Sequence, residues 1–417
     1  MDYISDLHIH SRFSRACSKY LTIESLEKWA RIKGVNLLGC GDFTHPEWIK
    51  EIKSNLTDNG KGIFLTKTNF PFILSSEISL IYTQDNKGRR VHLVLLAPSL
   101  DVVDKITSFL LTLGRIDYDG RPIFKLSCRD MTKKLKEISE EIEIIPAHIW
   151  TPWFSLFGSK SGFNTVDEAF GDQSHQIYAL ETGLSSDPEM NWTISGLDKY
   201  QLVSFSDSHS YWPWRLGREA TILDLEELSY QNIIKALRTG GGLKMTIEVD
   251  PSYGKYHIDG HRNCGIELEP SESIKINNIC PVCKKPLTIG VLQRVESLAD
   301  LEVGRKKENF IPFLRLLPLH ELISLIYKWP LNSKKTWAIY DSLIEKFDNE
   351  YNILLNINDF QGLIDEDLIN AIISNRKGEI KVKPGYDGVY GIPILGDVEI
   401  KPNVIKEKKQ KDLTDFS

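Results

Sequence analysis

The sequence predicts an α/β protein in which a β/α barrel is followed by a small zinc-binding module and a C-terminal mixed α/β domain. Apolar segments of strand length alternate with segments of helical periodicity over about 240 residues. This alternation favours a parallel α/β arrangement, and the number of units favours a closed barrel. Polar side chains recur where strand segments end, which indicates that one rim of the barrel carries a site.

Length and composition limit the classes of protein to which the chain can belong. At 417 residues the chain has room for two or three domains, and its 41% hydrophobic and 26% charged content is ordinary for a globular protein. No apolar run approaches the length of a membrane span, and no signal peptide is apparent, so we expect a soluble cytoplasmic protein without a membrane partner. The net charge of -6 means that local basic patches would have to bind any nucleic acid.

The barrel elements follow in order after an opening strand. Residues 22–33 have the pattern of an amphipathic helix that begins at Thr22 as N-cap and ends at Gly34. A short buried strand is expected at 35–40. The remaining expected strands are 72–74, 91–96, 142–145, 176–180 and 202–205, and the expected helices are 102–113, 129–140 and 226–238.

The opening run Asp6-Leu7-His8-Ile9-His10-Ser11 places two histidines one residue apart. Strand side chains alternate between faces, so His8 and His10 would lie on one face and could reach a single metal ion. Taken alone, the pair is equally compatible with two surface histidines.

Further imidazoles and carboxylates follow the later strand segments, where side chains converge on the rim of a parallel barrel. A single one, such as His92 in an apolar strand, would more simply be a hydrogen-bonded core histidine. Together they predict a cluster of divalent ions, which needs neutral imidazoles and bridging carboxylates. The predicted metal-binding set is His8, His10, Asp42, His45, Glu77, His92, His148, Asp207 and His209.

These residues, in this order, resemble the motifs of the PHP (polymerase and histidinol phosphatase) superfamily. The resemblance implies a distorted β/α barrel with two or three ions, zinc or alternatively magnesium or manganese, for phosphoester hydrolysis. It also implies catalytic roles for Glu77, as a bridging ligand, and for Asp207 and His209. The run 12–17 lacks the acid or histidine that many members have there, so Asp42 either substitutes as a ligand or only orients a ligand.

Within the superfamily, the chain resembles the endonuclease Q family through segments 149–154, 158–163 and 210–216, the cysteine cluster and 386–390. The family implies a DNA repair enzyme that nicks double- or single-stranded DNA on the 5′ side of uracil, hypoxanthine, xanthine and abasic sites. The aromatic rings of segment 149–154 could offer stacking faces to an extruded base, although they could equally belong to the packing of the barrel. The expected DNA-binding residues are Trp150, Trp153, Phe154, Ser159, Lys160, Trp212, Arg215, Lys284 and Lys285.

A second metal site is predicted from cysteine spacing. Cys280 and Cys283 form a CxxC knuckle, and His261 and Cys264 have the matching HxxC spacing, so these four side chains predict one structural zinc. His257 is the rival fourth ligand. Four protein ligands leave no open position for catalysis.

The expected division is a barrel at 1–245, a zinc module at 246–300, a DNA-binding domain at 301–400 and a flexible tail at 401–417. Helices are expected at 319–327, 337–347 and 365–376, and a Gly-rich turn at 381–390. In the tail, Gln410, Leu413 and Phe416 resemble the peptide that docks on the sliding clamp PCNA, which implies an archaeal source.

Our interpretation of the sequence is therefore a metal-dependent endodeoxyribonuclease for DNA repair. Two alternatives stay open at this point. One is a PHP-type phosphatase of a small phosphomonoester, and the other is a DNA-binding scaffold with an inactive barrel.

Overall fold

The computed structural model describes residues 1–395 and 398–399. In that part of the chain a ring of strands forms a distorted barrel, which confirms the predicted α/β barrel class. In ring order its strands are β1 (Asp2–Asp6), β2 (Leu37–Gly39), β5 (Pro71–Gln84), β6 (Lys87–Ala97), β8 (Glu143–Pro146), β9 (Ala179–Glu181), β10 (Gln201–Val203) and β11 (Ala220–Asp224).

The ring is completed by a few bonds rather than by continuous ladders, which is why the barrel is distorted. The amide of Ile149, just after β8, donates to the carbonyl of Glu181 in β9 at 3.0 Å. The amide of Ser204, after β10, donates to the hydroxyl of Thr221 in β11 at 3.0 Å. Between these joints, β9 and β10 pair in parallel.

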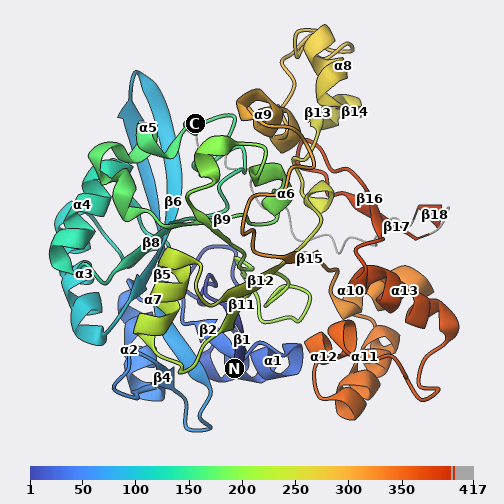
Figure 1. The fold of residues 1–417 in the computed structure, drawn as a ribbon, viewed down its shortest axis with the longest axis horizontal. Helices are drawn as coiled ribbons and strands as arrows, with labels where there is room; N and C mark the ends of the chain where they lie inside the picture. Colours follow the sequence, from blue (N-terminus) through green and yellow to red (C-terminus); the bar gives the residue numbers. More distant parts are fainter. Residues whose placement is uncertain (396–397, 400–417) are drawn as a thin grey trace.

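The parallel arrangement expected for the strands holds for only part of the ring. Strands β1, β2 and β5 are parallel, but β6 runs antiparallel to both β5 and β8, and β11 runs antiparallel to β1. For β6 the cause is the tight turn at Asp85 and Asn86, whose φ angles of 53° and 57° suit the hairpin turn that matches strand twist. This turn makes β5 and β6 one long hairpin that extends beyond the barrel (Figure 1).

Helices cover the outside of the barrel. Helix α1 (Ile23–Lys33) begins at Thr22, whose hydroxyl accepts from the amide of Ser25, and ends at Gly34 with φ 91°, as predicted. The other barrel helices are α2 (Pro46–Asn55), α3 (Leu100–Leu113), α4 (Cys128–Ile138), α5 (Val166–Phe170), α6 (Pro188–Asn191) and α7 (Tyr230–Thr239).

Further strands extend the sheet on both sides of the ring. Strand β12 pairs with β11, and β15 pairs with β12, while β4 and β7 pair with β5 and β3 pairs with β4. Their bounds are β3 (Thr57–Asp58), β4 (Phe64–Leu65), β7 (Ile123–Phe124), β12 (Leu243–Glu248) and β15 (Phe313–Arg315).

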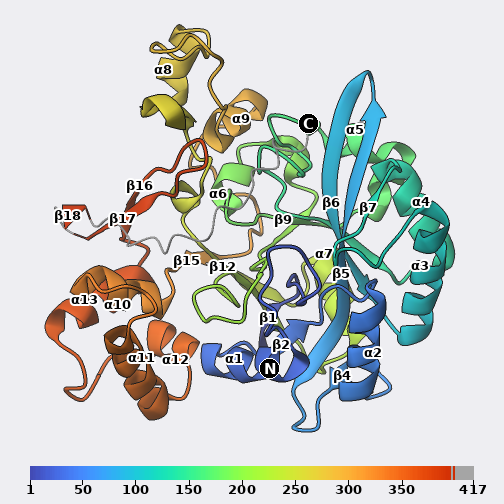
Figure 2. The same ribbon diagram turned by 180° about the vertical axis from the view of Figure 1, so that it is seen from behind.

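Two smaller units lie on one side of the barrel, as Figures 1 and 2 show from opposite directions. The first contains β13 (Asp259–His261), β14 (Ile266–Leu268), α8 (Pro270–Lys275) and α9 (Val291–Leu298). The second contains α10 (Leu319–Tyr327), α11 (Lys334–Phe347), α12 (Glu350–Leu355) and α13 (Glu366–Arg376), which share a hydrophobic core of their own. A three-stranded sheet follows, made of β16 (Lys381–Lys383), β17 (Ile392–Leu395) and β18 (Val398–Glu399).

The Gly-rich segment between β16 and β17 returns to the first of these units. The amide of Gly385 donates to the carbonyl of Ser252 at 2.8 Å, and the amide of Ile258 donates to the carbonyl of Gly385 at 3.1 Å. Asp387 accepts from the amide of Arg262, 125 residues away in sequence, at 2.6 Å. The segment between β16 and β17 therefore holds the unit that contains β13 and β14.

The helical unit joins the barrel through buried polar contacts. Lys33, the last residue of α1, pairs with Glu350 of α12 at 2.6 Å, and both side chains are buried. The Tyr351 hydroxyl donates to the carbonyl of Gly217, and Lys33 also donates to the carbonyl of Pro213. These bonds connect the helices to the loop that follows β10. Across the described residues, no helix is both long and apolar enough to span a membrane.

Candidate metal centre

Side chains from three distant parts of the barrel form one donor group on its rim. His8, His10, Glu77 and Asp207 each offer an atom within 4.8 Å of the others. The two histidines follow β1 rather than lying within it, but the bridge between Ile9 and Ser208 keeps the chain extended, so their side chains still share a face. Asp207 follows β10, and Glu77 lies in the middle of β5.

A second donor group uses Glu77 again, together with His92 and His148. Oε1 of Glu77 lies 2.7 Å from Nδ1 of His92 and 3.3 Å from Nε2 of His148. His92 reaches the rim from the first half of β6, because this strand is antiparallel to β5 and enters the barrel from the protruding hairpin. Glu77 is thus placed between the two groups, as a bridging carboxylate would be.

The backbone is constrained at these turns. Asp42, His148 and Asp207 have φ angles of 46°, 31° and 47°, in the left-handed region that residues other than glycine rarely adopt. Such conformations persist where surrounding contacts fix them, and they concentrate at functional sites.

The charges of the two groups suit metal ions. Burial would raise the pKa of Glu77, but His92, Arg121 and His8 hold it well below 4.5. Burial would likewise raise the pKa of Asp207, which His8 and His10 instead hold well below 3.8. Both carboxylates are therefore ionised, the form in which they bind cations.

The histidines divide into two classes. Burial would lower the pKa values of His8 and His10, but Glu181 and Asp42, their nearest carboxylates, raise both well above 6.5. Burial lowers the pKa of His92 to about 3, in spite of Glu77. Burial together with the charge of His10 lowers the pKa of His209 to about 4.

One buried atom is left for a ligand to satisfy. Nδ1 of His8 lies 2.8 Å from Glu181, whereas Nε2 is buried and makes no hydrogen bond to the described residues. Carboxylate oxygens of Glu77 and Asp207 lie 3.6 Å from this Nε2, too far for a hydrogen bond. An imidazole oriented by a carboxylate on one nitrogen and open on the other fits a divalent cation.

Asp42 and His45 lie outside both donor groups. Asp42 lies 2.9 Å from Nδ1 of His10 and accepts from Ser11 and Ser14, so of the two predicted roles the geometry favours the orienting one. His45 accepts from the amide of Glu47 at the start of α2 and stacks on Phe13 with ring centroids 4.3 Å apart.

His209 borders the first group without joining it. Its ring centroid lies 4.5 Å from that of His10, and its Nδ1 lies 3.0 Å from the backbone oxygen of Asp207.

Sequence reasoning missed Arg121. Its Nη1 donates to Oε2 of Glu77 at 2.9 Å. It precedes β7 in a loop with no recognisable motif, so only the parallel pairing of β7 with β5 reveals that it reaches the site.

The residues expected to bind DNA fall into distinct places. Trp150 is fully buried and donates to Asn191 at 2.8 Å, so the expectation that it offers a stacking face was wrong. Phe154 is partly exposed, and its ring centroid lies 4.8 Å from that of His92. Trp153 packs against Tyr256, and Trp212 packs between Trp29, Trp214 and Trp337 at the junction with the C-terminal helices.

The polar residues expected to bind DNA are at least partly accessible. Ser159 donates to the carbonyl of Ile289, and Arg215 is partly buried. Lys160, Lys284 and Lys285 are exposed.

The Cys/His group is a separate centre. His261, Cys264, Cys280 and Cys283 have donor atoms within 4.8 Å of one another, whereas His257 is not part of the group. His261 ends β13, Cys264 follows in a single 3₁₀ turn, and the knuckle is closed by the amide of Cys280 donating to the carbonyl of Lys285 at 2.8 Å. Three sulfurs and one imidazole nitrogen are the donors of structural zinc sites.

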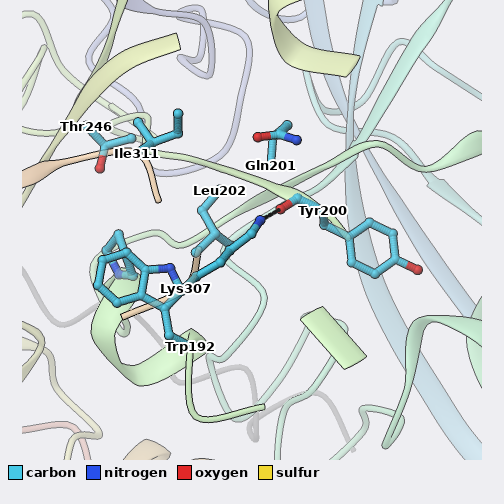
Figure 3. Close-up of a pocket in the computed structure, with 8 residues that line it drawn as sticks. Trp192, Tyr200, Gln201, Leu202, Thr246, Lys307 and Ile311 are labelled. Atoms are coloured by element: carbon cyan, nitrogen blue, oxygen red, sulfur yellow. Dashed lines mark hydrogen bonds between the residues drawn. The ribbon is translucent and has the colours of Figure 1, made fainter. Parts of the chain in front are cut away.

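A small pocket lies elsewhere, beside the start of β10 (Figure 3). Lys307 crosses it and donates to the carbonyl of Tyr200 at 3.2 Å, with Trp192 and Leu202 nearby. None of the residues that line it belongs to either donor group on the rim, so we do not assign it to the metal centre.

Comparison with known proteins extends beyond the site. A family model described as the MJ0043 C-terminal domain matches residues 318–379. The uncharacterized protein MJ0043 of Methanocaldococcus jannaschii is 30% identical over 288 residues, which are 68% of this chain but only 35% of that protein. The uncharacterized protein YqxK of Bacillus subtilis is 29% identical over 408 residues, covering 93% of this chain and 98% of that one.

Solved structures match over the whole length. The lesion-specific endonuclease PfuEndoQ from Pyrococcus furiosus is 29% identical with a TM-score of 0.85, covering 100% of both chains. An endonuclease Q in complex with a 27-mer duplex substrate, with an abasic lesion at its active site, is 30% identical with a TM-score of 0.84, covering 99% of this chain and 100% of the other. The chain therefore belongs to the endonuclease Q family.

Proposed function

We propose that the protein is a metal-dependent DNA repair endonuclease that hydrolyses a phosphodiester on the 5′ side of a damaged nucleotide. The observation that carries this proposal is the pair of donor groups that share Glu77 on the rim of the barrel. Paired divalent ions are a common means of stabilising both oxygens of an in-line displacement at phosphorus. The full-length similarity to an endonuclease Q bound to a lesion-containing duplex supports DNA as the substrate.

The chain's own residues have distinct roles in this proposal. His8, His10, Glu77 and Asp207 would hold one ion, and Glu77, His92 and His148 would hold another. Zinc is the first candidate, with magnesium or manganese as alternatives. Bound ions would supply an activated water and a positive charge beside the leaving oxygen. Glu181 and Asp42 orient His8 and His10 through their Nδ1 atoms.

His209 is suited to move a proton. Desolvation of the ring is the main cause that lowers the pKa of His209 to about 4, so the ring is neutral at physiological pH and could accept a proton during the reaction. Its Nδ1 is turned to the backbone of Asp207, which leaves Nε2 as the accepting atom.

We expect uracil, hypoxanthine, xanthine and abasic sites as lesions. A nucleotide that pairs poorly is less costly to extrude from the duplex, which favours damaged positions. Phe154 supports this expectation because it is a partly exposed ring beside His92, at the second donor group. Its φ of 59° indicates that the local fold fixes its position.

The remaining parts would bind the duplex. In this proposal residues 1–245 form the barrel that cleaves the DNA. A zinc-ordered module at 246–300 presents Lys284 and Lys285 to the phosphates, and residues 301–400 help to hold the duplex. The segment with Gln410, Leu413 and Phe416 lies outside the described residues, and PCNA binding stays a prediction. Deleting 410–417 and measuring capture by a sliding clamp tests it, and unchanged capture would remove it.

The test of the main proposal is a cleavage assay with labelled duplexes. These duplexes contain uracil, hypoxanthine, xanthine, an abasic site or no lesion, with manganese, magnesium or zinc added. We expect a single nick 5′ of each lesion. Asp207→Asn, which tolerates the positive φ, should reduce the rate by roughly 100-fold or more. Asp172→Asn, at an exposed ion pair with Arg129, is the matched control and should retain full activity.

Two other results would contradict the proposal. Hydrolysis of a small phosphomonoester without cleavage of any duplex would indicate a phosphatase. Tight binding to lesion duplexes without cleavage under any metal would indicate a scaffold.

A further inference from the structure

The guanidinium of Arg121 lies at the solvent-facing side of the metal centre. The Arg121 side chain is 24% exposed, whereas Glu77, to which it donates, is 0% exposed. Asp207 and His209 are 31% and 32% exposed. His8 and His10, by contrast, are fully buried. A substrate that approaches from solvent therefore meets Arg121, Asp207 and His209 before the other members of the centre.

The loop that carries Arg121 is fixed at its first half by the turn after His10. The amide of Gly120 donates to the carbonyl of Phe13 at 3.1 Å. Asp119 accepts from the amides of both Arg15 and Arg121 at 3.2 Å. A Cβ atom on Gly120 would collide with the side chains of Asp42 and Ser14, so only glycine allows this close approach.

The second half of the loop is fixed by β5. The carbonyl of Pro122 accepts from the amide of Ser79, two residues after Glu77, at 3.0 Å. Strand β7 then pairs in parallel with Ser79 and Leu80. The backbone on both sides of Arg121 is therefore anchored, by the turn after His10 and by β5, so the position of this loop does not depend on the bond to Glu77.

The carboxylate of Glu77 lies close to more groups than its two oxygens can bind at once. Besides Arg121, imidazole nitrogens of four histidines lie between 2.7 and 3.6 Å from its oxygens. Both donor groups need this carboxylate. Bound ions would share the charge of this carboxylate, which would weaken its attraction for the guanidinium and let the Arg121 side chain reach a substrate at the solvent-facing side.

We infer that Arg121 is a catalytic residue that binds a non-bridging oxygen of the scissile phosphodiester. The inference rests on the proposed phosphodiester hydrolysis and adds a residue to it. A guanidinium presents parallel N–H donors that match two phosphate oxygens, and it stays charged at any physiological pH. Negative charge grows on those oxygens during the displacement, so a fixed cation there stabilises the transition state more than the bound substrate.

The alternative role is structural, with Arg121 acting only to orient Glu77, and the two roles differ in what removal does to metal binding. If Arg121 binds phosphate, Arg121→Ala should bind manganese as tightly as the wild type or more tightly, because a competing cation is gone. If it only orients Glu77, the variant should bind manganese more weakly. Free manganese measured by electron paramagnetic resonance during a titration distinguishes these outcomes without any cleavage.

The second measurement uses inorganic phosphate as the probe. With manganese saturating, Arg121→Ala should bind phosphate about 10-fold more weakly and cleave lesion duplexes roughly 100-fold more slowly in kcat, with a change in KM of no more than about 10-fold. Added guanidinium should restore part of the rate. Arg121→Lys keeps the charge without the paired donors, so it should fold normally and give an intermediate rate.

Arg115→Ala is the matched control. Arg115 lies in the same loop and forms an exposed pair with Asp117 at 2.9 Å, so its removal should change neither titration. Weaker manganese binding with unchanged phosphate binding in Arg121→Ala would overturn the inference. If the wild type does not cleave DNA, the proposed function fails, whereas the phosphate titration still decides the role of Arg121.

Discussion

Oε2 of Glu181 lies 2.8 Å from Nδ1 of His8, and both side chains are buried. This contact fixes the imidazole so that Nε2 is directed to the first donor group. Glu181 is not a member of that group. Substituting it therefore shows how much the orientation of His8 contributes to metal affinity while all four donors are kept.

We expect Glu181→Gln to weaken metal binding about 10- to 100-fold, because the amide keeps the shape but loses the charge that orients the imidazole. A metal titration monitored by calorimetry measures this change. Glu227→Gln, at an exposed pair with Lys61, should leave the affinity unchanged. Equal affinities for wild type and Glu181→Gln would mean that His8 needs no orienting partner.

The Cys/His group allows a comparison of two histidines. His261→Asn should lose the structural zinc and expose the unit around β13 and β14 to proteolysis, because that unit is small and metal binding would contribute to its folding. His257→Asn should keep the zinc content of the wild type, since His257 is outside the group. Metal content by mass spectrometry and limited proteolysis are the measurements. The reverse result would make His257 the ligand.

The junction between the barrel and the C-terminal helices depends on a buried ion pair. Lys33→Met should reduce the free energy of unfolding by about 3–5 kcal/mol, because Glu350 is then left buried without its cation. Lys61→Met breaks an exposed pair and should change it by less than about 1 kcal/mol. Urea denaturation measures both. A small effect at Lys33 would show that water reaches Glu350 when the lysine is removed.

His320 should make stability depend on pH. It is fully buried, neither ring nitrogen has a hydrogen-bond partner among the described residues, and burial together with the charge of Lys33 lowers its pKa to about 3. Below pH 6.5 the unfolded chain takes up a proton at this residue, whereas the folded chain does not until about pH 3. The contribution of neutral His320 is therefore complete above pH 6.5 and is lost as the pH falls toward 3.

Replacing His320 by Leu should remove this loss. Between pH 6.5 and 5 the wild type should lose about 2 kcal/mol more than the variant, at about 1.4 kcal/mol per pH unit. Urea denaturation at the two pH values measures the difference. His175 is exposed, so His175→Leu is the control and its free energy of unfolding should vary with pH as that of the wild type does. Identical slopes for His320→Leu and wild type would mean that the buried ring is protonated in the folded state.

The sequence predicts best those features that short segments determine. The limits of α1 follow from Thr22 and Gly34, both of which act through bonds within a few residues. The Cys/His spacing likewise identifies its four donors locally. The antiparallel course of β6 was missed because it depends on the turn at Asp85 and Asn86, inside a stretch with no apolar pattern.

Residues that act over long distances were harder to predict. Arg121 reaches Glu77 across 44 residues and has no motif around it. Trp150 stands in a segment similar to the family motif, but the sequence does not show whether an aromatic ring is exposed or buried. Its complete burial and its bond to Asn191, 41 residues away, show that it belongs to the core.

The return of residues 385–391 to the Cys/His unit has a consequence for synthesis on the ribosome. Arg262 leaves the ribosome 125 residues before its partner Asp387. At about 5–20 residues per second, the unit waits several seconds for the segment that holds it. During that interval a bound metal would be what orders the four donors, so metal supply during translation should govern the yield of correctly assembled protein.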